Sequence, residues 1–147
     1  MKLSEKTQNL FEMEEDIYLA HCISADFVMG KGIASQFNRR FDLKAALKRA
    51  YPQYVRRWRE EEIGGSCLPE GRVFSLVTKE RWMQKPTYDS LRRALEQMRA
   101  QCEERGVRRL AMPRIACGLD GLEWARVRAM IEEVFGGTQM EITVCSL

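Results

Sequence analysis

This sequence lacks long apolar runs and groups of metal-binding side chains. No stretch approaches the ~20 apolar residues of a membrane-spanning helix, and Met1–Lys6 has no apolar core like that of a signal peptide. Only one histidine, His21, is present, and none of the five cysteines forms a CxxC pair. We therefore expect an intracellular, soluble protein with reduced thiols, no metal, no cofactor and no membrane contact, located in the cytoplasm or in the nucleus of a eukaryotic source.

An excess of charge of one sign is also missing. The formal net charge is +3, and acidic and basic residues alternate along the chain. The densest basic cluster, Arg56-Arg57-Trp58-Arg59, is followed at once by three glutamates. This pattern favours a solvated helix face over contact with a phosphate-rich partner. With 147 residues, of which 45% are hydrophobic, we expect a single domain over residues 1–147 and a monomer.

Apolar runs alternate with amphipathic segments. Strands are expected over 17–23, 72–78, 107–112 and 140–147, and helices over 33–41, 87–105 and 122–135. Residues 43–62 have a helical pattern that Pro52 interrupts, and Gly64-Gly65-Ser66 indicates a loop. Strands that alternate with helices predict an α/β sheet covered on both faces.

Two glycine-containing loops each follow an expected strand: Met29-Gly30-Lys31-Gly32-Ile33-Ala34, and Ile115-Ala116-Cys117-Gly118-Leu119-Asp120-Gly121. A strand that is followed by a glycine-containing loop and then a helix directs backbone N–H groups toward one point. Such an arrangement is suited to bind a phosphate. Neither loop matches GxGxxG or a Walker A sequence, so tight-turn packing is an equally good explanation of either loop alone. Two loops together suit a ligand with two phosphates.

Two polar residues near these loops have a structural and a catalytic interpretation. Asp120-Gly121-Leu122-Glu123 has the spacing of a helix N-cap followed three residues later by glutamate, and this spacing alone favours capping by Asp120. Lys79 ends an expected strand, where a lysine usually lies on the surface. Trp82 either shields a bound sugar or packs on the helix after Pro86, and packing is favoured.

Several sequence blocks together resemble those of macrodomains, in the order found in the terminal ADP-ribose glycohydrolase branch, which is itself similar to antitoxin macrodomains of DNA-ADP-ribosylating systems. The likeness runs from about Leu10 to Leu147. The blocks are Ala20-His21-Cys22-Ile23-Ser24, Met29-Gly30-Lys31-Gly32-Ile33-Ala34, Val77-Thr78-Lys79, Lys85-Pro86-Thr87-Tyr88, Met112-Pro113-Arg114-Ile115 and Cys117-Gly118-Leu119-Asp120.

The resemblance implies a three-layer α/β/α sandwich with a central mixed sheet and an ADP-ribose site across its strand ends. It implies Lys79 and Asp120 as the catalytic pair. The implied ADP-ribose-binding residues are Asn9, Leu10, Ser24, Gly30, Lys31, Gly32, Ile33, Pro113, Ala116, Cys117, Gly118 and Leu119. Asn9 stands where the family usually has an adenine-binding aspartate, and Cys145 where an aromatic residue is often found, so Phe11 is a candidate for stacking on the adenine.

A neutral lysine amine can attack an anomeric carbon, and a carboxylate can accept and return protons. The resemblance therefore predicts a hydrolase that removes ADP-ribosyl groups from protein carboxylates or nucleic-acid bases, with Lys79 as nucleophile and Asp120 as acid and base. The expected partners are ADP-ribose and ADP-ribosylated protein or nucleic acid. Two alternatives stay open: a non-catalytic ADP-ribose reader, and a hydrolase of O-acetyl-ADP-ribose or ADP-ribose 1″-phosphate. A Cys117–His21 dyad is disfavoured, because His21 lies within an expected buried strand.

Overall fold

One mixed sheet of six strands forms the centre of the protein in the computed structural model, which describes all residues 1–147. Along the sheet the order is β1-β6-β5-β2-β4-β3, and every neighbouring pair is parallel except β3 and β4. The strands are β1 (Lys2–Thr7), β2 (Tyr18–Ser24), β3 (Ser66–Glu70), β4 (Val73–Lys79), β5 (Arg109–Met112) and β6 (Glu141–Ser146).

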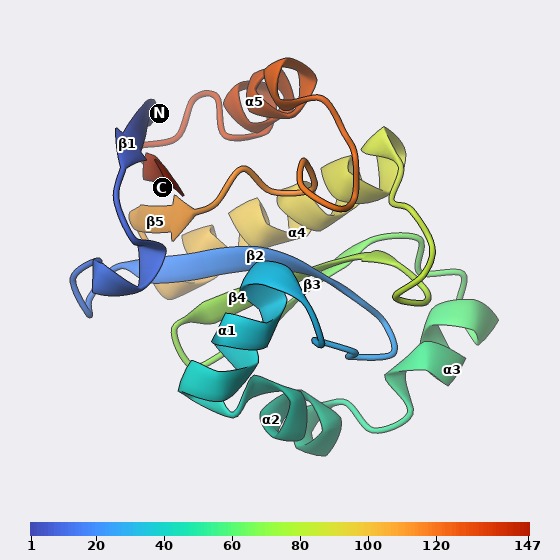
Figure 1. Cartoon of the computed structure of the whole chain (residues 1–147). Helices are drawn as coiled ribbons and strands as arrows, with labels where there is room; N and C mark the ends of the chain where they lie inside the picture. The colour runs from blue at the N-terminus through green and yellow to red at the C-terminus, as the bar shows by residue number, and fades with distance from the viewer.

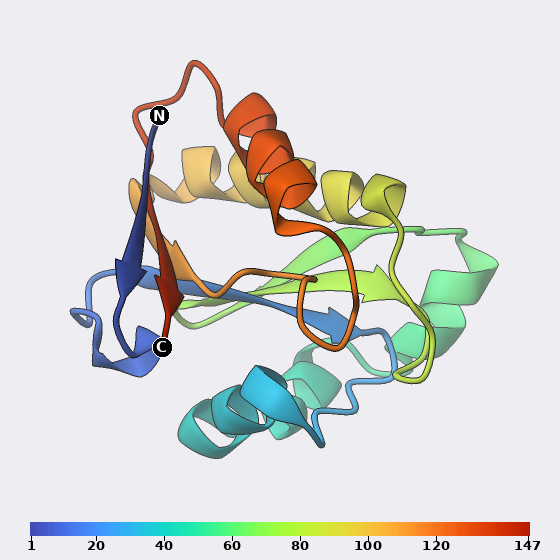
Figure 2. The same cartoon turned by 45° about the horizontal axis from the view of Figure 1, so that its top comes forward.

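Helices cover both faces of this sheet. They are the 3-10 helix η1 (Leu10–Glu12) and the α-helices α1 (Gly32–Phe41), α2 (Leu43–Ala50), α3 (Tyr54–Glu60), α4 (Tyr88–Arg105) and α5 (Trp124–Val134). Helices α4 and α5 lie on one face, whereas α1, α2 and α3 lie on the other, as Figures 1 and 2 show. The expected three-layer α/β/α sandwich is therefore confirmed. No helix combines the length and the apolarity needed to cross a bilayer.

The core consists of two apolar clusters, one on each side of the sheet. Strand β4 contributes to both, because successive side chains of a strand point to opposite faces. Phe74 and Leu76 belong to the cluster with α4 and α5, whereas Val73 and Val77 belong to the cluster with α1, α2 and α3. The continuous apolar run of this strand therefore reflects burial on both faces.

The expected elements agree with the structure except at the edges of the sheet. Pro52 lies between α2 and α3, as its position predicts. Strands β1 and β3, which the sequence pattern did not indicate, are the two edge strands. Strand β1 is largely polar, with the sequence KLSEKT, and β3 contains Pro69, a residue that edge strands tolerate.

The central position of β2 determines where a ligand can bind. Strand β2 lies between β5 and β4, and the three strands are parallel. Their carboxyl ends therefore meet at one edge, and the loops that leave them run to opposite faces of the sheet. In open α/β sheets, ligands bind in the crevice that such diverging loops create.

Candidate functional site

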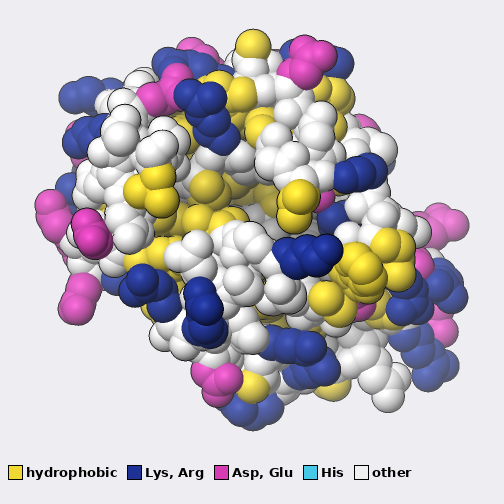
Figure 3. All heavy atoms as spheres, viewed as in Figure 1, with side chains coloured by type: hydrophobic (Ala, Val, Ile, Leu, Met, Phe, Trp, Pro, Cys, Tyr) yellow, Lys and Arg dark blue, Asp and Glu magenta, His cyan; other side chains and the backbone are white.

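A cavity of about 750 Å³ opens at the carboxyl ends of β2, β4 and β5. Its walls come from three segments, within residues 22–34, 79–85 and 113–120. Figure 3 shows the hollow on the face of the molecule seen in Figure 1, with hydrophobic side chains exposed inside it. The volume lies within the ~300–1,000 Å³ typical of small-molecule sites.

Most of the expected ligand-binding residues line this cavity: Ser24, Gly30, Lys31, Gly32, Ile33, Pro113, Ala116, Gly118 and Leu119. Three others lie outside the lining. Asn9 caps η1, since its Oδ1 accepts a hydrogen bond from the backbone N–H of Phe11 at 2.9 Å. Leu10 is buried in the core cluster beside α1, and Cys117 packs against the opposite cluster.

The amino end of α1 forms one wall of the cavity. The N-cap residue, Lys31, has extended backbone dihedrals, and no side chain caps the helix. The first N–H groups of a helix have no intrahelical partner and carry partial positive charge. Gly32 has φ of +60°, a conformation that glycine adopts without strain. This wall is therefore suited to bind a phosphate group.

The loop between β5 and α5 forms the opposite wall. Ala116 holds a left-handed backbone conformation with φ of +61°, and its carbonyl accepts a hydrogen bond from the N–H of Leu122 at 2.9 Å. The backbone N–H groups of Gly118 and Leu119 have no backbone acceptor. Both walls thus contain backbone N–H groups without a backbone acceptor, as a diphosphate site would require.

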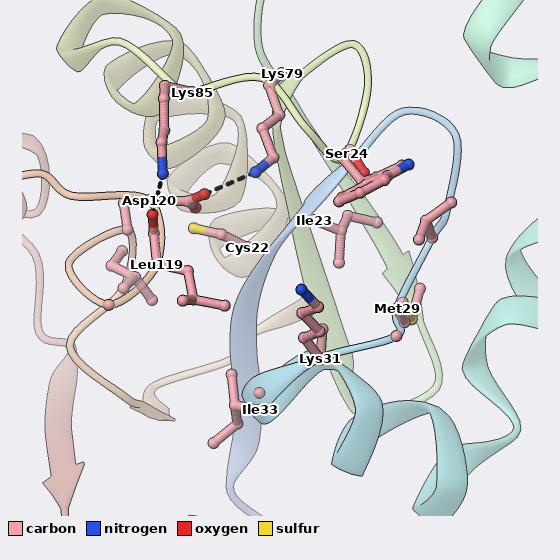
Figure 4. Close-up of a pocket in the computed structure, with 18 of the residues that line it drawn as sticks. Cys22, Ile23, Ser24, Met29, Lys31, Ile33, Lys79, Lys85, Leu119 and Asp120 are labelled. Carbon is pink, nitrogen blue, oxygen red and sulfur yellow. Dashed lines mark hydrogen bonds and ion pairs between the residues drawn. The ribbon is translucent and has the colours of Figure 1, made fainter.

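Lys79 and Asp120 meet at one end of the cavity (Figure 4). The Lys79 Nζ donates to Asp120 Oδ1 at 2.7 Å, and the two side chains are only 12% and 19% exposed. Lys79 is the last residue of β4, and Asp120 lies in the loop before α5. The pair therefore combines a potential nucleophile with a proton acceptor in a site largely shielded from water.

Asp120 does not cap α5, so the capping expectation is wrong. The helix begins at Trp124, and its N-cap is Glu123, whose side chain makes no capping hydrogen bond. Asp120 lies within a turn that the Gly121 N–H closes onto the Gly118 carbonyl at 3.2 Å, ahead of the helix. The carboxylate is directed to Lys79 instead.

Two further side chains, neither of which was predicted as a site residue, connect the loops around the cavity. Lys85 Nζ donates to the carbonyl oxygen of Leu119, beside the Lys79–Asp120 pair. Asp26 Oδ1 accepts from Ser24 Oγ at 2.5 Å, and its Oδ2 accepts from the backbone N–H of Trp82 at 3.0 Å. No sequence signal identified Asp26, because a single aspartate after a strand is common in loops.

His21 and Cys117 do not form a catalytic dyad. His21 is fully buried, stacks on Phe37 with ring centroids 4.0 Å apart, and its Nε2 is 2.8 Å from Ser75 Oγ. Burial lowers the pKa of His21 to about 3 and raises that of the Cys117 thiol. Both groups are therefore neutral at physiological pH, as expected for a core histidine and an unreactive thiol.

The structure also locates the basic cluster and the tryptophan that the sequence analysis discussed. Arg56 and Arg57 form i,i+4 ion pairs with Glu60 and Glu61 on the exposed side of α3, which supports the solvated-face interpretation. Trp82 lines the cavity and is 50% exposed, a position that suits the alternative role of shielding a bound sugar. No group of three or more His, Cys, Asp or Glu side chains comes close enough to hold a metal ion.

The chain is similar to known proteins over most of its length. The family model described as "Macro domain" matches residues 20–131. The chain is 41% identical over 140 residues to the human ADP-ribose glycohydrolase OARD1, covering 95% of this chain and 88% of that protein. It is 29% identical over 118 residues to the DNA ADP-ribosyl glycohydrolase of Thermus aquaticus, covering 78% of this chain and 33% of that protein.

A solved structure shows the same architecture. The macrodomain of Thermus aquaticus DarG matches with a TM-score of 0.76 and 27% sequence identity, covering 99% of this chain and 98% of that chain. The two chains therefore share the framework of strands and helices that carries the cavity walls of this protein.

Proposed function

The chain belongs to the macrodomain family, and we propose that it is an ADP-ribosyl glycohydrolase, which removes ADP-ribosyl groups from protein carboxylates or nucleic-acid bases. The similarity to two glycohydrolases supports hydrolysis of this kind. The observation that carries the proposal is the Lys79–Asp120 pair at the end of a cavity with two phosphate-binding walls. A shielded amine beside a carboxylate can supply a nucleophile and a proton acceptor, which binding alone does not require.

The proposed ligand lies across the cavity, with its diphosphate between the amino end of α1 and the 116–119 loop. Lys31 and Ile33 project from the α1 side, opposite Leu119 in Figure 4. This position directs the distal ribose toward Lys79. The Ser24 hydroxyl donates a hydrogen bond to Asp26. Ser24 therefore offers the cavity an oxygen that can accept a hydrogen bond, and we assign it no role as a nucleophile.

In the first step, Lys79 gives a proton to Asp120 across the existing hydrogen bond. The neutral amine then forms a bond between Nζ and C1″ of the distal ribose, while the bond from C1″ to the acceptor breaks. With a carboxylate acceptor, the electron pair leaves on the carboxylate oxygen. With a nucleobase, the proton held by Asp120 goes to the departing nitrogen.

In the second step, a proton moves from Nζ to the ring oxygen O4″ and the C1″–O4″ bond breaks, so that C1″ and Nζ form a Schiff base. Water then adds to C1″, the C1″–Nζ bond breaks, and ring closure returns the O4″ proton to Nζ. One proton from the water returns Lys79 to its charged form. With a carboxylate acceptor, the proton on Asp120 passes to solvent. The enzyme then holds ADP-ribose and its original ion pair, so the cycle is complete. No metal or cofactor enters either step.

The proposal is tested by offering the full chain three substrates and measuring free ADP-ribose. These are a peptide ADP-ribosylated on glutamate, an ADP-ribosylated single-stranded oligonucleotide and O-acetyl-ADP-ribose. Release from the peptide or the oligonucleotide is expected. Release from O-acetyl-ADP-ribose alone would favour a metabolite hydrolase, and micromolar binding of ADP-ribose without any release would favour a reader. If no binding occurs at millimolar ADP-ribose, the site itself is wrongly assigned.

A further inference from the structure

Almost all exposed large apolar side chains of this protein gather at the cavity. Val28 is 37% exposed, Trp82 50%, Met83 59% and Leu119 71%, and all four line the cavity. The fifth exposed residue of this kind, Leu147, is the last residue of the chain. We call the first four residues the apolar rim.

This grouping of exposed apolar side chains differs from their usual distribution on a protein surface. Single exposed apolar residues scattered over a protein are normal, whereas apolar residues that gather at one place mark a site of contact with another molecule. The ligand proposed above offers little to match the rim, because its sugars and phosphates are polar and its one apolar group, the adenine, lies at the opposite end of the ligand from Lys79. The rim therefore has an occupant other than the diphosphate or the riboses.

The rim lies next to the reacting groups. Trp82 and Met83 follow Lys79 by three and four residues, and Leu119 directly precedes Asp120. The backbone of Trp82 is held at the cavity edge, because its N–H donates to the same Asp26 carboxylate that accepts from Ser24 at the end of β2. In the proposed position, C1″ of the distal ribose lies beside Lys79. The acceptor group bonded to C1″ would therefore leave the cavity along these side chains.

The charges around the cavity indicate the chemistry of this group. Most lining cations already have partners, since Lys79 binds Asp120, Lys85 binds the Leu119 carbonyl and Arg114 lies 3.3 Å from Glu5. Lys31 has no such partner, but it belongs to the diphosphate wall at the start of α1. A nucleic-acid strand requires several free cations along its path, and the rim does not provide them.

We propose that the apolar rim is an acceptor subsite, which binds an apolar side chain next to the ADP-ribosylated carboxylate of a protein. This inference rests on the proposed function and narrows it to protein acceptors with an apolar neighbour. Trp82 is its central contact, because aromatic side chains supply most of the binding free energy in such pockets. The subsite contributes to acceptor specificity and leaves the chemistry at C1″ unchanged.

Two peptides test the inference. They carry the same ADP-ribosylated glutamate and differ at the adjacent residue, which is leucine in one and serine in the other. For the unmodified enzyme we expect kcat/KM for the leucine peptide to exceed that for the serine peptide at least about fivefold, mainly through KM. In W82A this ratio should fall to about one, and W82F should restore most of it. L147A, which removes an exposed apolar side chain outside the cavity lining, is the control.

The outcomes separate the inference from the proposed function. Equal kcat/KM for the two peptides, or a preference that survives in W82A, would overturn the acceptor subsite while leaving the hydrolase intact. Faster release from an ADP-ribosylated oligonucleotide than from either peptide would replace the protein acceptor with a nucleic acid. If no substrate releases ADP-ribose, the proposed function fails and the subsite fails with it. Thermal unfolding of W82A and W82F checks that both variants are folded.

Discussion

Lys79 and Asp120 are 41 residues apart in the chain, yet their side chains form a 2.7 Å ion pair. One residue ends a central strand, and the other lies in a loop that approaches from the neighbouring strand β5. The pair depends on the strand order, because β2 separates β4 from β5 and leaves room for a cavity between their loops. Binding and chemistry are thus assigned to different parts of one site, and they can be separated by mutation.

Replacing Lys79 by alanine should remove turnover and leave binding in place. We expect the rate of ADP-ribose release to fall roughly 10³-fold or more, since loss of a covalent nucleophile is among the most severe changes in an enzyme. The Kd for ADP-ribose, measured by calorimetry, should change less than about threefold, because the phosphate-binding walls remain. Turnover near that of the unmodified chain would exclude Lys79 as the nucleophile.

Asp120→Asn retains the size of the side chain and removes its ability to accept a proton. We expect kcat to fall about 10²–10⁴-fold, the usual contribution of a general acid or base. Asp89→Asn is the matched control, because it disrupts an exposed ion pair with Arg93 on α4, outside the cavity lining. If the two variants show similar kcat values, Asp120 has only a structural role.

Gly32→Ala tests the wall formed by α1. Gly32 and Gly106 have nearly the same φ, +60° and +66°, and both have open space where a Cβ would lie. Each alanine variant should therefore lose about 1–2 kcal/mol of stability through backbone strain alone. Only Gly32→Ala should also weaken ADP-ribose binding in calorimetry, since Gly106 ends α4 outside the cavity lining. Equal affinities in the two variants would place the diphosphate elsewhere.

His21 gives a pH dependence that can be measured separately from catalysis. Burial lowers its pKa in the folded state to about 3, below the usual 6.5. Between these values only the unfolded chain binds the proton, so its contribution to the unfolding free energy is complete above pH 6.5 and decreases as the pH falls toward 3. The slope approaches about 1.4 kcal/mol per pH unit. Urea unfolding at pH 7, 5 and 4 should show a smaller decrease for His21→Gln.

Because His21 is the only histidine in the sequence, NMR can follow its ring directly. The ring signals should not titrate between pH 8 and pH 5. A midpoint near 6.5 would mean that the ring is accessible to water in the folded state.

The central part of the fold was predictable because its physical signals are strong. The apolar run of β4 and the capped amphipathic helix α4 follow from burial and periodicity. Strand β1 was not predicted, because its residues are mostly polar and its edge position requires little apolar surface. Pairing with β6, at the other end of the chain, makes it a strand, and no local pattern contains that information.

The candidate site was predictable only in part. The glycine loops and the macrodomain resemblance located Lys79 and Asp120, but the local spacing alone favoured Asp120 as a helix cap. The carboxylate instead contacts a lysine from a distant segment, and a pattern of four residues cannot describe such a contact. The roles of Asp26 and Trp82 also depend on contacts between loops that only the folded chain brings together.

The most direct test of the proposed mechanism is mass spectrometry of the protein after borohydride trapping during turnover of an ADP-ribosylated peptide. The proposed mechanism predicts one covalent adduct, located on the tryptic peptide that contains Lys79, and its loss in Lys79→Ala. An adduct on another residue, or continued turnover by Lys79→Ala without any adduct, would contradict it.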